Sequence, residues 1–426
     1  MKLSLDKKKS LRADITIPPD KSLSHRAVMF NSLAKGKANI SNFLMGEDCL
    51  STISVLKKLG VKIEIHDNNV VTHGMGINAL SKPNEILDVG NSGTTIRLMS
   101  GVLAGRNFES ILDGDSSIRK RPMNRIIKPL NMMGANITAE NDNENAPIKF
   151  LGGELSQLKY DLPVASAQLK SSLILAGLRS KDGIEIKEKA TSRDHTERLL
   201  SNMGADINVN GLEITVNPSN IESRDIIVPG DISSASFWLI AGCIHDDAEI
   251  TIRNVGINKT RSGIINVLKR MGASMEFFNE KDYSGEPACD IFVKSSSLKG
   301  TEVYGDEIPL LIDEIPIIAL ASVFAEGKTT ISDAEELRYK ESDRISLTVN
   351  WMKKAGADVE ELKDGMIING NNKIQGGVFS SHGDHRLAMT LGIASLVAEN
   401  SISIENAEAS NVSYPGFWDY LNDLGE

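Results

Sequence analysis

The sequence of 426 residues is poor in cysteine and carries no excess of positive charge. Its three cysteines are widely spaced, so they form neither a disulfide framework nor a metal-binding pair. Acidic side chains outnumber basic ones by 57 to 47, which argues against a nucleic-acid partner. A signal-peptide pattern and an apolar run of membrane-spanning length are also missing. We therefore expect a cytoplasmic protein with no membrane or nucleic-acid partner.

Four short motifs that mark common enzyme classes are absent as well. The sequence has no phosphate-binding Gly-x-x-x-x-Gly-Lys-Ser/Thr loop and no dinucleotide-binding Gly-x-Gly-x-x-Gly turn. It also lacks the zinc-binding His-Glu-x-x-His pair and the Gly-x-Ser-x-Gly turn that presents a nucleophilic serine. These absences argue against the enzyme classes that depend on those four motifs.

A short motif recurs every 68 to 84 residues, and its last copy, at Gly425, is truncated. In this motif a hydrophobic residue is followed by glycine and then by alanine or valine. The five complete copies contain Gly60, Gly134, Gly204, Gly272 and Gly356. Each complete copy follows an amphipathic stretch and precedes strand-like segments, such as 61–65 and 70–72. Glycine at such a junction ends a helix in the left-handed conformation. The spacing therefore predicts six copies of one helix–glycine–strand–turn–strand unit.

The truncated sixth copy indicates how the units are shared between domains. Its helix, at 415–424, is followed by no strands. Two strand-like segments near the other terminus, at 2–5 and 14–18, have no helix of their own. We infer that these two segments complete the sixth unit.

This arrangement predicts two domains of three repeats each. The first domain spans 20–228, and the second combines 1–19 with 229–426. The chain would cross between them near 19–20 and near 228–230, where proline and glycine interrupt the pattern. Two such crossings form a hinge, and substrates of hinged proteins commonly bind in the cleft.

Several predicted helices begin with a polar turn and carry cations in or beside their first turn. The segment 20–26 leads into apolar residues at helical spacing, with Ser22 as a plausible N-cap. Lys21 and Arg26 then lie beside free backbone N–H groups, where the helix dipole favours an anion. The segments 90–97, 165–168, 231–234 and 383–386 repeat the design. Each alone is more often a simple helix cap, but equivalent units would direct these helix ends to one place.

Two other charged features are candidates of unequal strength. The basic residues of 119–128 and the run Lys340-Glu341-Ser342-Asp343-Arg344 suit anionic substrates, but isolated charge runs are usually solvated surface. A helix starting near Ser342 would place the Glu341 carboxylate among cations, where it could transfer protons. Asp313 lies in the apolar stretch 309–317, where a charge is costly unless it is paired or used. Asp313 is therefore the stronger candidate by itself.

Taken in order along nearly the whole chain, these motifs resemble those of the 5-enolpyruvylshikimate-3-phosphate synthases, the enolpyruvyl transferases of the shikimate pathway. The motifs lie at 20–26, 90–95, 112–115, 119–123, 166–168, 192–195, 312–314, 340–344 and 384–386. Each is weak alone, but the ordered set is highly specific. The resemblance implies an α/β fold, a two-domain inside-out α/β barrel with three βαβαββ repeats in each domain and six in all. It also implies helix N-termini that face a cleft, which closes on the substrate.

The resemblance also implies a reaction. The enolpyruvyl group of phosphoenolpyruvate would pass to the 5-hydroxyl of shikimate 3-phosphate with release of phosphate, on the route to chorismate and the aromatic amino acids. The implied mechanism is addition then elimination through a tetrahedral intermediate, in a monomer without metal or cofactor. Both substrates carry a phosphate and a carboxylate, which explains converging cations in an acidic protein.

Carried over position by position, the resemblance implies three overlapping sets of residues. The implied contacts of shikimate 3-phosphate are Lys21, Ser22, Arg26, Ser166, Gln168, Arg193, Asp313 and Lys340. Those of phosphoenolpyruvate are Lys21, Gly93, Arg121, Gln168, Arg344 and Arg386. The implied catalytic residues are Asp313, Glu341, Lys21, His385 and Asp384. Within the catalytic set, Glu341 is expected to act at C3 of phosphoenolpyruvate and Asp313 on the proton of the 5-hydroxyl.

Two positions depart from the pattern of some family members. Ala167 stands where those members have a second serine, and Val412 stands where they have a lysine. The departures remove one hydroxyl and one cation from the implied sites, and they fit the Ser-Ala-Gln (class II-like) subgroup of the family.

Two other readings give different functions. The UDP-N-acetylglucosamine enolpyruvyl transferases share the implied fold and donor, but their mobile loop carries a catalytic cysteine that 113–121 lacks. A non-catalytic, RNA-handling relative of the fold is the other alternative. The excess of acidic over basic residues and the apolar surroundings of Asp313 in the sequence argue against this alternative.

Overall fold

The computed structural model describes residues 1–424, which form two compact units. Unit 1 comprises Met1–Pro18, Pro229–Asp282 and the chain from Pro287 onward, and unit 2 comprises Pro19–Val228 with Tyr283–Glu286. Each unit has its own hydrophobic core. The segment Tyr283–Glu286 was not expected in unit 2, because a hairpin turn carries no sequence signal for its packing partner. The hinge expected from the sequence stays a prediction.

Unit 2 contains three four-stranded sheets, ordered β14-β3-β5-β4, β6-β7-β9-β8 and β10-β11-β13-β12. Its strands are β3 (Lys35–Ser41), β4 (Lys62–His66), β5 (Asn69–Met75), β6 (Leu87–Asp88), β7 (Ser110–Asp113), β8 (Ile137–Ala139), β9 (Asn145–Phe150), β10 (Leu158–Asp161), β11 (Ile184–Lys187), β12 (Ile207–Asn210), β13 (Glu213–Val216) and β14 (Ile226–Ile227). Its helices are α1 (Lys21–Leu33), α2 (Glu47–Lys58), α3 (Gly93–Leu103), α4 (Asn124–Met132), the one-turn α5 (Glu140–Asn143), α6 (Ala167–Gly177) and α7 (His195–Asn202), with a 3-10 turn at Ile118–Lys120.

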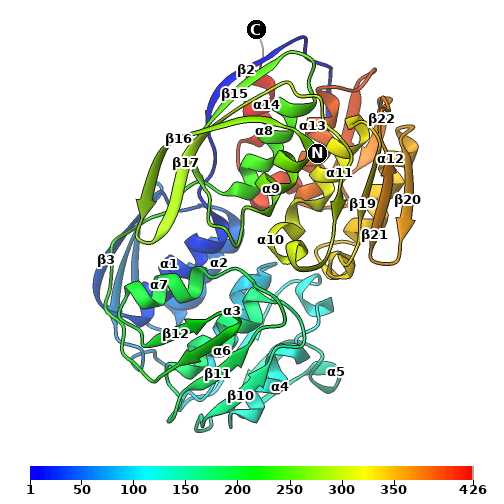
Figure 1. The fold of residues 1–426 in the computed structure, drawn as a ribbon. Helices are drawn as coiled ribbons and strands as arrows, with labels where there is room; N and C mark the ends of the chain where they lie inside the picture. Colours follow the sequence, from blue (N-terminus) through cyan, green and yellow to red (C-terminus); the bar gives the residue numbers. More distant parts are fainter. Residues whose placement is uncertain (425–426) are drawn as a thin grey trace. The chain divides into compact units, whose positions relative to one another are not determined.

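Unit 1 has the sheets β16-β17-β15-β2, β18-β19-β21-β20 and β1-β23-β22. Its strands are β1 (Lys2–Leu5), β2 (Leu11–Thr16), β15 (Ala248–Gly256), β16 (Ser274–Tyr283), β17 (Glu286–Lys294), β18 (Glu302–Val303), β19 (Lys328–Ile331), β20 (Asp358–Leu362), β21 (Gly365–Asn369), β22 (Gly377–Ser380) and β23 (Ile402–Glu405). Its helices are α8 (Ile232–Ile244), α9 (Gly263–Met271), α10 (Ile308–Leu311), α11 (Ile315–Phe324), α12 (Arg344–Lys354), α13 (His385–Ser395) and α14 (Phe417–Asp423). Further 3-10 turns lie at Gly305–Glu307, Ile312–Glu314, Glu335–Tyr339 and Ala407–Val412, and Figure 1 labels most of the helices and strands.

The sheets repeat one plan, which confirms the predicted α/β fold. In each four-stranded sheet an outer strand runs parallel to its neighbour, as β6 does to β7, and a hairpin such as β8–β9 adds antiparallel strands. The sixth sheet has only three strands, and β1 pairs there with β23 as the sequence predicted.

The prediction for the second N-terminal strand was wrong. β2 pairs in parallel with β15 and completes the fourth unit, whereas the sequence had assigned it to the sixth. The strand pattern of β2 gives its two faces, but it does not specify which of two open sheet edges the strand will join.

The junction glycines confirm the repeat. Gly60, Gly134, Gly204, Gly272 and Gly356 all have positive φ, between +87° and +103°. Such values are rare for residues with a side chain, so glycine is favoured where each helix turns into its strand. Gly425 lies outside the described residues.

The helices of each unit fall into two kinds. In each unit, three helices are buried over most or all of their length. They are α1, α3 and α6 in unit 2, and α8, α11 and α13 in unit 1. Others, such as α4 and α9, bury one face only. A helix that is buried on every side offers only its ends to polar ligands, so function is expected at the N-termini of the buried helices. Among the described residues, no helix is long and apolar enough to cross a membrane.

Candidate active site

In unit 2, the N-terminus of α1 presents Lys21 and Ser22. Asp20 is the N-cap, and its side chain accepts a hydrogen bond from the backbone N–H of Leu23 at 2.8 Å. The sequence had assigned the cap to Ser22, which is wrong by two residues, because both aspartate and serine are good caps. Since Asp20 does the capping, the Ser22 hydroxyl can accept a hydrogen bond from Arg193 Nη1, at 3.4 Å.

Lys21 and His25 differ in charge although both belong to the same motif. Lys21 Nζ lies 2.9 Å from a carboxylate oxygen of Asp48, at the start of α2. His25 is fully buried beside Thr52, and burial lowers its pKa to about 3. The imidazole is therefore neutral near pH 7, and Lys21 and Arg26 supply the positive charge of this motif.

Arg26 is buried, and its guanidinium donates to three groups of the protein. Nε contacts the Thr196 hydroxyl at 2.7 Å, and Nη2 contacts the Ser171 hydroxyl at 2.9 Å. Nη1 donates to the backbone carbonyl of Ser22 at 3.0 Å. Burial lowers the pKa of Arg26 to about 10, so it is still a cation at neutral pH. A guanidinium has five N–H groups, which leaves it further donors for a ligand.

The N-termini of α3 and α6 meet through side-chain contacts. Ser166 caps α6 and accepts a hydrogen bond from Leu169 N at 3.4 Å. Gln168 accepts a hydrogen bond from Arg97 at 2.6 Å and donates to Thr94 at 3.1 Å. The amide of Gln168 is thus oriented by two residues of α3.

Arg121 differs in burial from Arg119, which belongs to the same basic cluster. It is buried, and its Nη2 donates to Asn91 Oδ1 at 2.5 Å, whereas Arg119 is exposed and paired with Asp113. A Cβ atom on Gly93 would lie 2.8 Å from Nη1 of Arg121, so glycine leaves room for that guanidinium. The sequence reading of a solvated surface holds for Arg119 but not for Arg121.

Unit 1 gathers three predicted acidic residues on one buried cation, Arg344. Its Nε lies 2.9 Å from Asp384, and its Nη2 lies 2.6 Å from Glu341. Its Nη1 lies 3.1 Å from Asp313, which also faces Lys340 at 3.5 Å. Burial alone would lower the pKa of Arg344, but Asp384, Glu341 and Asp313 outweigh that effect and raise it.

Helix α12 begins at Arg344, two residues after Ser342, because Asp343 is its N-cap. Ser342, predicted at this start, instead donates to Asp384 at 2.9 Å. The predicted buried face of α12 is confirmed, since Ile345, Val349 and Met352 are fully buried.

Asp384 caps α13, and its side chain accepts a hydrogen bond from Arg386 N at 2.8 Å. Burial alone would raise its pKa, but the charge of Arg344 outweighs burial, with help from His385, and lowers the pKa. His385 is itself buried at the first position of α13. Asp384 therefore stays ionised and fixes Arg344 in place.

Glu314, next to Asp313, is the more deeply buried carboxylate of the apolar stretch. It is fully buried and accepts a short hydrogen bond from Ser233, while Asp313 is only partly buried. Arg386 Nη1 lies 3.9 Å from Glu314 and donates to the Ser233 carbonyl at 3.3 Å. The apolar pattern predicted a buried acid in the right segment, but helical phase decides which of two neighbours points inward.

The predicted residues therefore meet within each unit. Unit 2 brings together the predicted residues Lys21, Ser22, Arg26, Gly93, Arg121, Ser166, Gln168 and Arg193 at the ends of α1, α3 and α6 and in the adjoining loops. Unit 1 brings together Asp313, Lys340, Glu341, Arg344 and Asp384, with His385 and Arg386 on the adjoining turn of α13.

Sequence reasoning missed the partners that hold these residues. They include Asp48 and Thr196, and also Asn91 and Ser233, which stand inside the predicted helix starts 90–97 and 231–234 but were not predicted as partners. Each lies far along the chain from the residue that it contacts, so no local pattern could identify it. Arg97 stood inside a quoted motif, and its helical position relative to Gly93 is the signal that could have found it.

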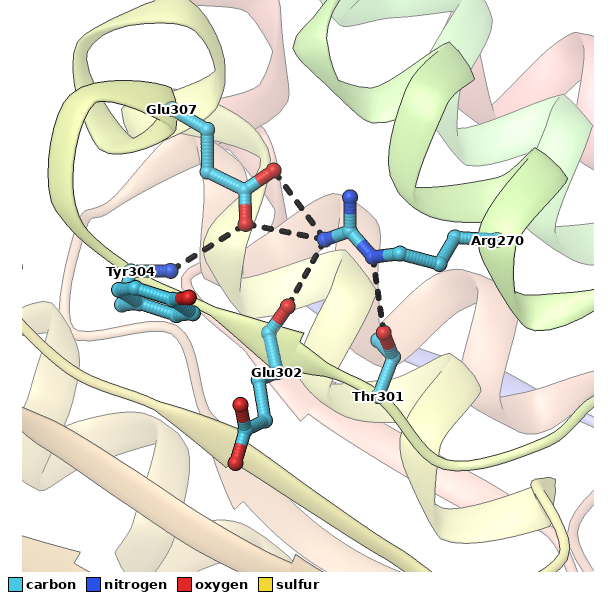
Figure 2. A pocket seen from close by; sticks show the side chains of 5 residues that line it. All are labelled: Arg270, Thr301, Glu302, Tyr304 and Glu307. Atoms are coloured by element: carbon cyan, nitrogen blue, oxygen red, sulfur yellow. Dashed lines mark hydrogen bonds and ion pairs between the residues drawn. The ribbon is translucent and has the colours of Figure 1, made fainter.

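An open pocket of about 480 Å³ in unit 1 lies apart from these sets (Figure 2). Its cation, Arg270, makes two contacts with the Glu307 carboxylate, at 2.9 and 3.1 Å, and also donates to Thr301 and the Glu302 carbonyl. The guanidinium is thus neutralised within the protein. None of the five lining residues belongs to the predicted sets, so the pocket is separate from the candidate site.

The chain matches the family model described as EPSP synthase (3-phosphoshikimate 1-carboxyvinyltransferase) over residues 5–421. It is 50% identical over 419 residues to the 3-phosphoshikimate 1-carboxyvinyltransferase of Thermoanaerobacter sp. (strain X514), covering 98% of this chain and 99% of the relative. It is 49% identical to the enzyme of that name from Bacillus subtilis (strain 168), with 99% of both chains covered.

A solved structure of EPSP synthase from Acinetobacter baumannii has the same fold. The TM-score is 0.89 at 40% sequence identity, and the match covers 100% of this chain and 98% of that one.

We expect Asp384→Asn to lower the free energy of unfolding at pH 7 by about 1–3 kcal/mol, because it weakens a buried charged hydrogen bond. Asparagine keeps the helix cap. The folded pKa of Asp384 lies below its usual 3.8, so the stabilisation is complete above that value and disappears as the pH falls through the folded pKa. The gap between wild type and variant should therefore shrink below about pH 4 in urea denaturation series.

The control is Glu399→Gln, which removes an exposed ion pair with Lys373. We expect little change from it, because solvent screens the pair. A wild-type-like stability of Asp384→Asn at pH 7, or a gap that widens in acid, would contradict the role assigned to Asp384.

Proposed function

The chain belongs to the EPSP synthase (3-phosphoshikimate 1-carboxyvinyltransferase) family and has its activity, and on that premise we propose which of its residues bind the substrates and move the protons. The reaction transfers the enolpyruvyl group of phosphoenolpyruvate to the 5-hydroxyl of shikimate 3-phosphate. The observation that supports our assignment best is the Arg344 cluster, where acids from three separate segments meet one buried cation.

The chemistry has two stages. In the addition, the 5-hydroxyl oxygen bonds to C2 of phosphoenolpyruvate, Asp313 takes the hydroxyl proton, and Glu341 protonates C3. In the elimination, Glu341 takes a proton back from C3, the bond from C2 to the phosphate oxygen breaks, and the hydroxyl proton leaves with phosphate. Arg344 holds both carboxylates, and Asp384, whose pKa His385 helps to lower, holds Arg344.

Phosphoenolpyruvate is assigned to the arginines that keep donors for an anion. Within the described residues, Nε of Arg386 is buried and makes no hydrogen bond, which is costly unless a ligand accepts from it. Arg121 and Gly93, which adjoin each other in unit 2, form the second part of this assignment, and the proposal adds Lys21 and Gln168 from unit 2 and Arg344 from unit 1.

Shikimate 3-phosphate is assigned to the remaining predicted residues. In unit 2, Ser22 and Arg193 contact each other, and Arg26 donates to the Ser22 carbonyl, so two cations flank the N-terminus of α1. Phosphate at such a site gains charge-assisted hydrogen bonds from arginine and from the helix N-terminus. Lys21, Ser166 and Gln168 complete the set in unit 2, and Asp313 with Lys340 completes it in unit 1.

The finer classification is also a proposal. The Ser166 hydroxyl caps α6, and Ala167 offers no second hydroxyl, which supports the Ser-Ala-Gln subgroup. The three cysteines are buried and form no disulfide among the described residues, which suits the reducing cytoplasm. We propose that the enzyme acts there as a monomer, as the family resemblance implies.

Phosphate release tests the function directly. We expect release with shikimate 3-phosphate plus phosphoenolpyruvate, and none with UDP-N-acetylglucosamine plus phosphoenolpyruvate. Release only with the sugar nucleotide would overturn the acceptor. If neither pair of substrates releases phosphate, the result would favour a non-catalytic relative. A fluorescence titration that shows salt-sensitive binding of single-stranded RNA would then support that interpretation.

Glu341→Gln should lower kcat by about 10²–10⁴-fold, because it removes the acid–base group, while both substrates still bind. The glutamine oxygen can still accept from Arg344, so the local geometry is retained. Steady-state kinetics and binding titrations would measure the two effects. The control, Glu335→Gln, changes an exposed acid on the preceding turn and should leave kcat unaltered. An equal loss of binding in Glu341→Gln would assign the residue to structure.

Arg121→Ala and Arg193→Ala should separate the two substrates. We expect each to raise one KM by at least about 10-fold, for phosphoenolpyruvate with Arg121 and for shikimate 3-phosphate with Arg193, since each removes a charged hydrogen-bond donor. Arg119→Ala is the matched control, because Arg119 lies in the same segment as Arg121 but is exposed. The reverse pattern, or equal effects on both KM values, would refute the division.

A further inference from the structure

A buried ion cluster in unit 2 takes no part in the reaction described above. Lys170, on α6, has a side chain that is only 1% exposed. Its ammonium lies 3.0 Å from Glu188, just after β11, and 2.7 Å from Glu197, on α7. One cation therefore connects three elements of the unit.

The cluster encloses the turn that carries Arg193. Lys170 Nζ also donates to the backbone carbonyl of Ser192 at 3.3 Å, so each of its three protons has an acceptor. The Ser192 hydroxyl in turn donates to the second oxygen of Glu188 at 2.5 Å. The residue immediately before Arg193 is thus fixed at its carbonyl and at its side chain.

The same two helices also hold Arg26. Ser171, next to Lys170 on α6, and Thr196, next to Glu197 on α7, share a hydrogen bond of 2.6 Å. Both hydroxyls accept from Arg26. The position of α7 relative to α6, which Lys170 sets through Glu197, therefore determines where both Arg26 and Arg193 present their guanidinium groups.

This cluster is a costly way to fill a core. Removing an ammonium and two carboxylates from water is unfavourable, and apolar residues of similar size often stabilise such a site better. Burial raises the pKa of Glu197 by more than the charge of Lys170 lowers it. In addition, Oε2 of Glu197 receives no hydrogen bond within the described residues. Stability alone does not account for the arrangement, but placement of the turn at 192–194 does.

We propose that Lys170, with Glu188 and Glu197 as its counter-ions, is a positioning residue for the phosphorylated acceptor. It sets the geometry of Arg193 and Arg26 and so selects a substrate with a phosphate and a carboxylate. The inference rests on the proposed binding of shikimate 3-phosphate by these two arginines. It concerns the affinity for that substrate and assigns Lys170 no contact with it.

The test compares Lys170→Met with wild type in steady-state kinetics. Methionine fills a similar volume without charge or donors, so the turn at 192–194 loses its support. We expect KM for shikimate 3-phosphate to rise at least about 10-fold, with kcat and KM for phosphoenolpyruvate within about 2-fold of wild type. No change in the first KM, or an equal rise in both, overturns the proposal.

The matched control is Arg106→Met. Arg106 is another buried cation of unit 2, but it donates to the backbone carbonyls of Val102 and Ile77, at 2.9 and 2.7 Å, and contacts none of the proposed site residues. It should lower thermal stability at least as much as Lys170→Met and leave both KM values unchanged. A similar rise in KM for the acceptor would reduce the role of Lys170 to general stability.

Glu188 provides a milder pair of variants if Lys170→Met does not fold. In Glu188→Gln, the amide oxygen can accept from Lys170 and the amide N–H can donate to the Ser192 hydroxyl, so we expect a wild-type KM for the acceptor. Glu188→Ala loses both contacts and should raise that KM. Equal KM values for the two variants overturn the proposal. A wild-type enzyme that releases no phosphate with shikimate 3-phosphate would instead contradict the proposed function.

Discussion

The carboxylates of Asp313, Glu341 and Asp384 all meet the buried guanidinium of Arg344. A cation inside an α/β core is costly unless charged or polar groups there compensate it, and for Arg344 three segments of the chain supply carboxylates. This requirement fixes the 3-10 turn before α11, the approach to α12 and the cap of α13 with respect to one another. It also leaves two of the carboxylates, those of Asp313 and Glu341, partly exposed.

Unit 2 also contains buried cations, but different groups compensate their charge. Two of its buried cations, Arg26 and Lys170, are matched by hydroxyls and carboxylates of α6, α7 and the loop between β11 and α7. The result is a set of arginines whose positions depend on buried neighbours more than on their own helices. Because the centre of each unit consists of helices buried on most or all sides, polar chemistry gathers at their N-termini.

Much of this could be predicted from local patterns. The helix–glycine–strand repeat depends on a backbone conformation that glycine favours, so its period identified the units, and the φ angles of the five described glycines confirm it. The buried face of α12 followed from helical spacing alone. The wrong helix cap arose because two residues were locally equivalent, since Asp20 and Ser22 can both cap a helix. The apolar pattern also did not say which of Asp313 and Glu314 is the more deeply buried, because the two differ in helical phase.

The sequence by itself determined the repeat, the elements and the types of residue that bind anions, because each of these depends on spacing along the chain. Only the tertiary structure decided the partners. It joined β2 to β15, turned Arg121 inward while Arg119 stayed in solvent, and placed Lys170 among two acids and the carbonyl of Ser192. These outcomes depend on burial and on contacts between segments distant in sequence, and the free energy of a buried charge is set by those contacts.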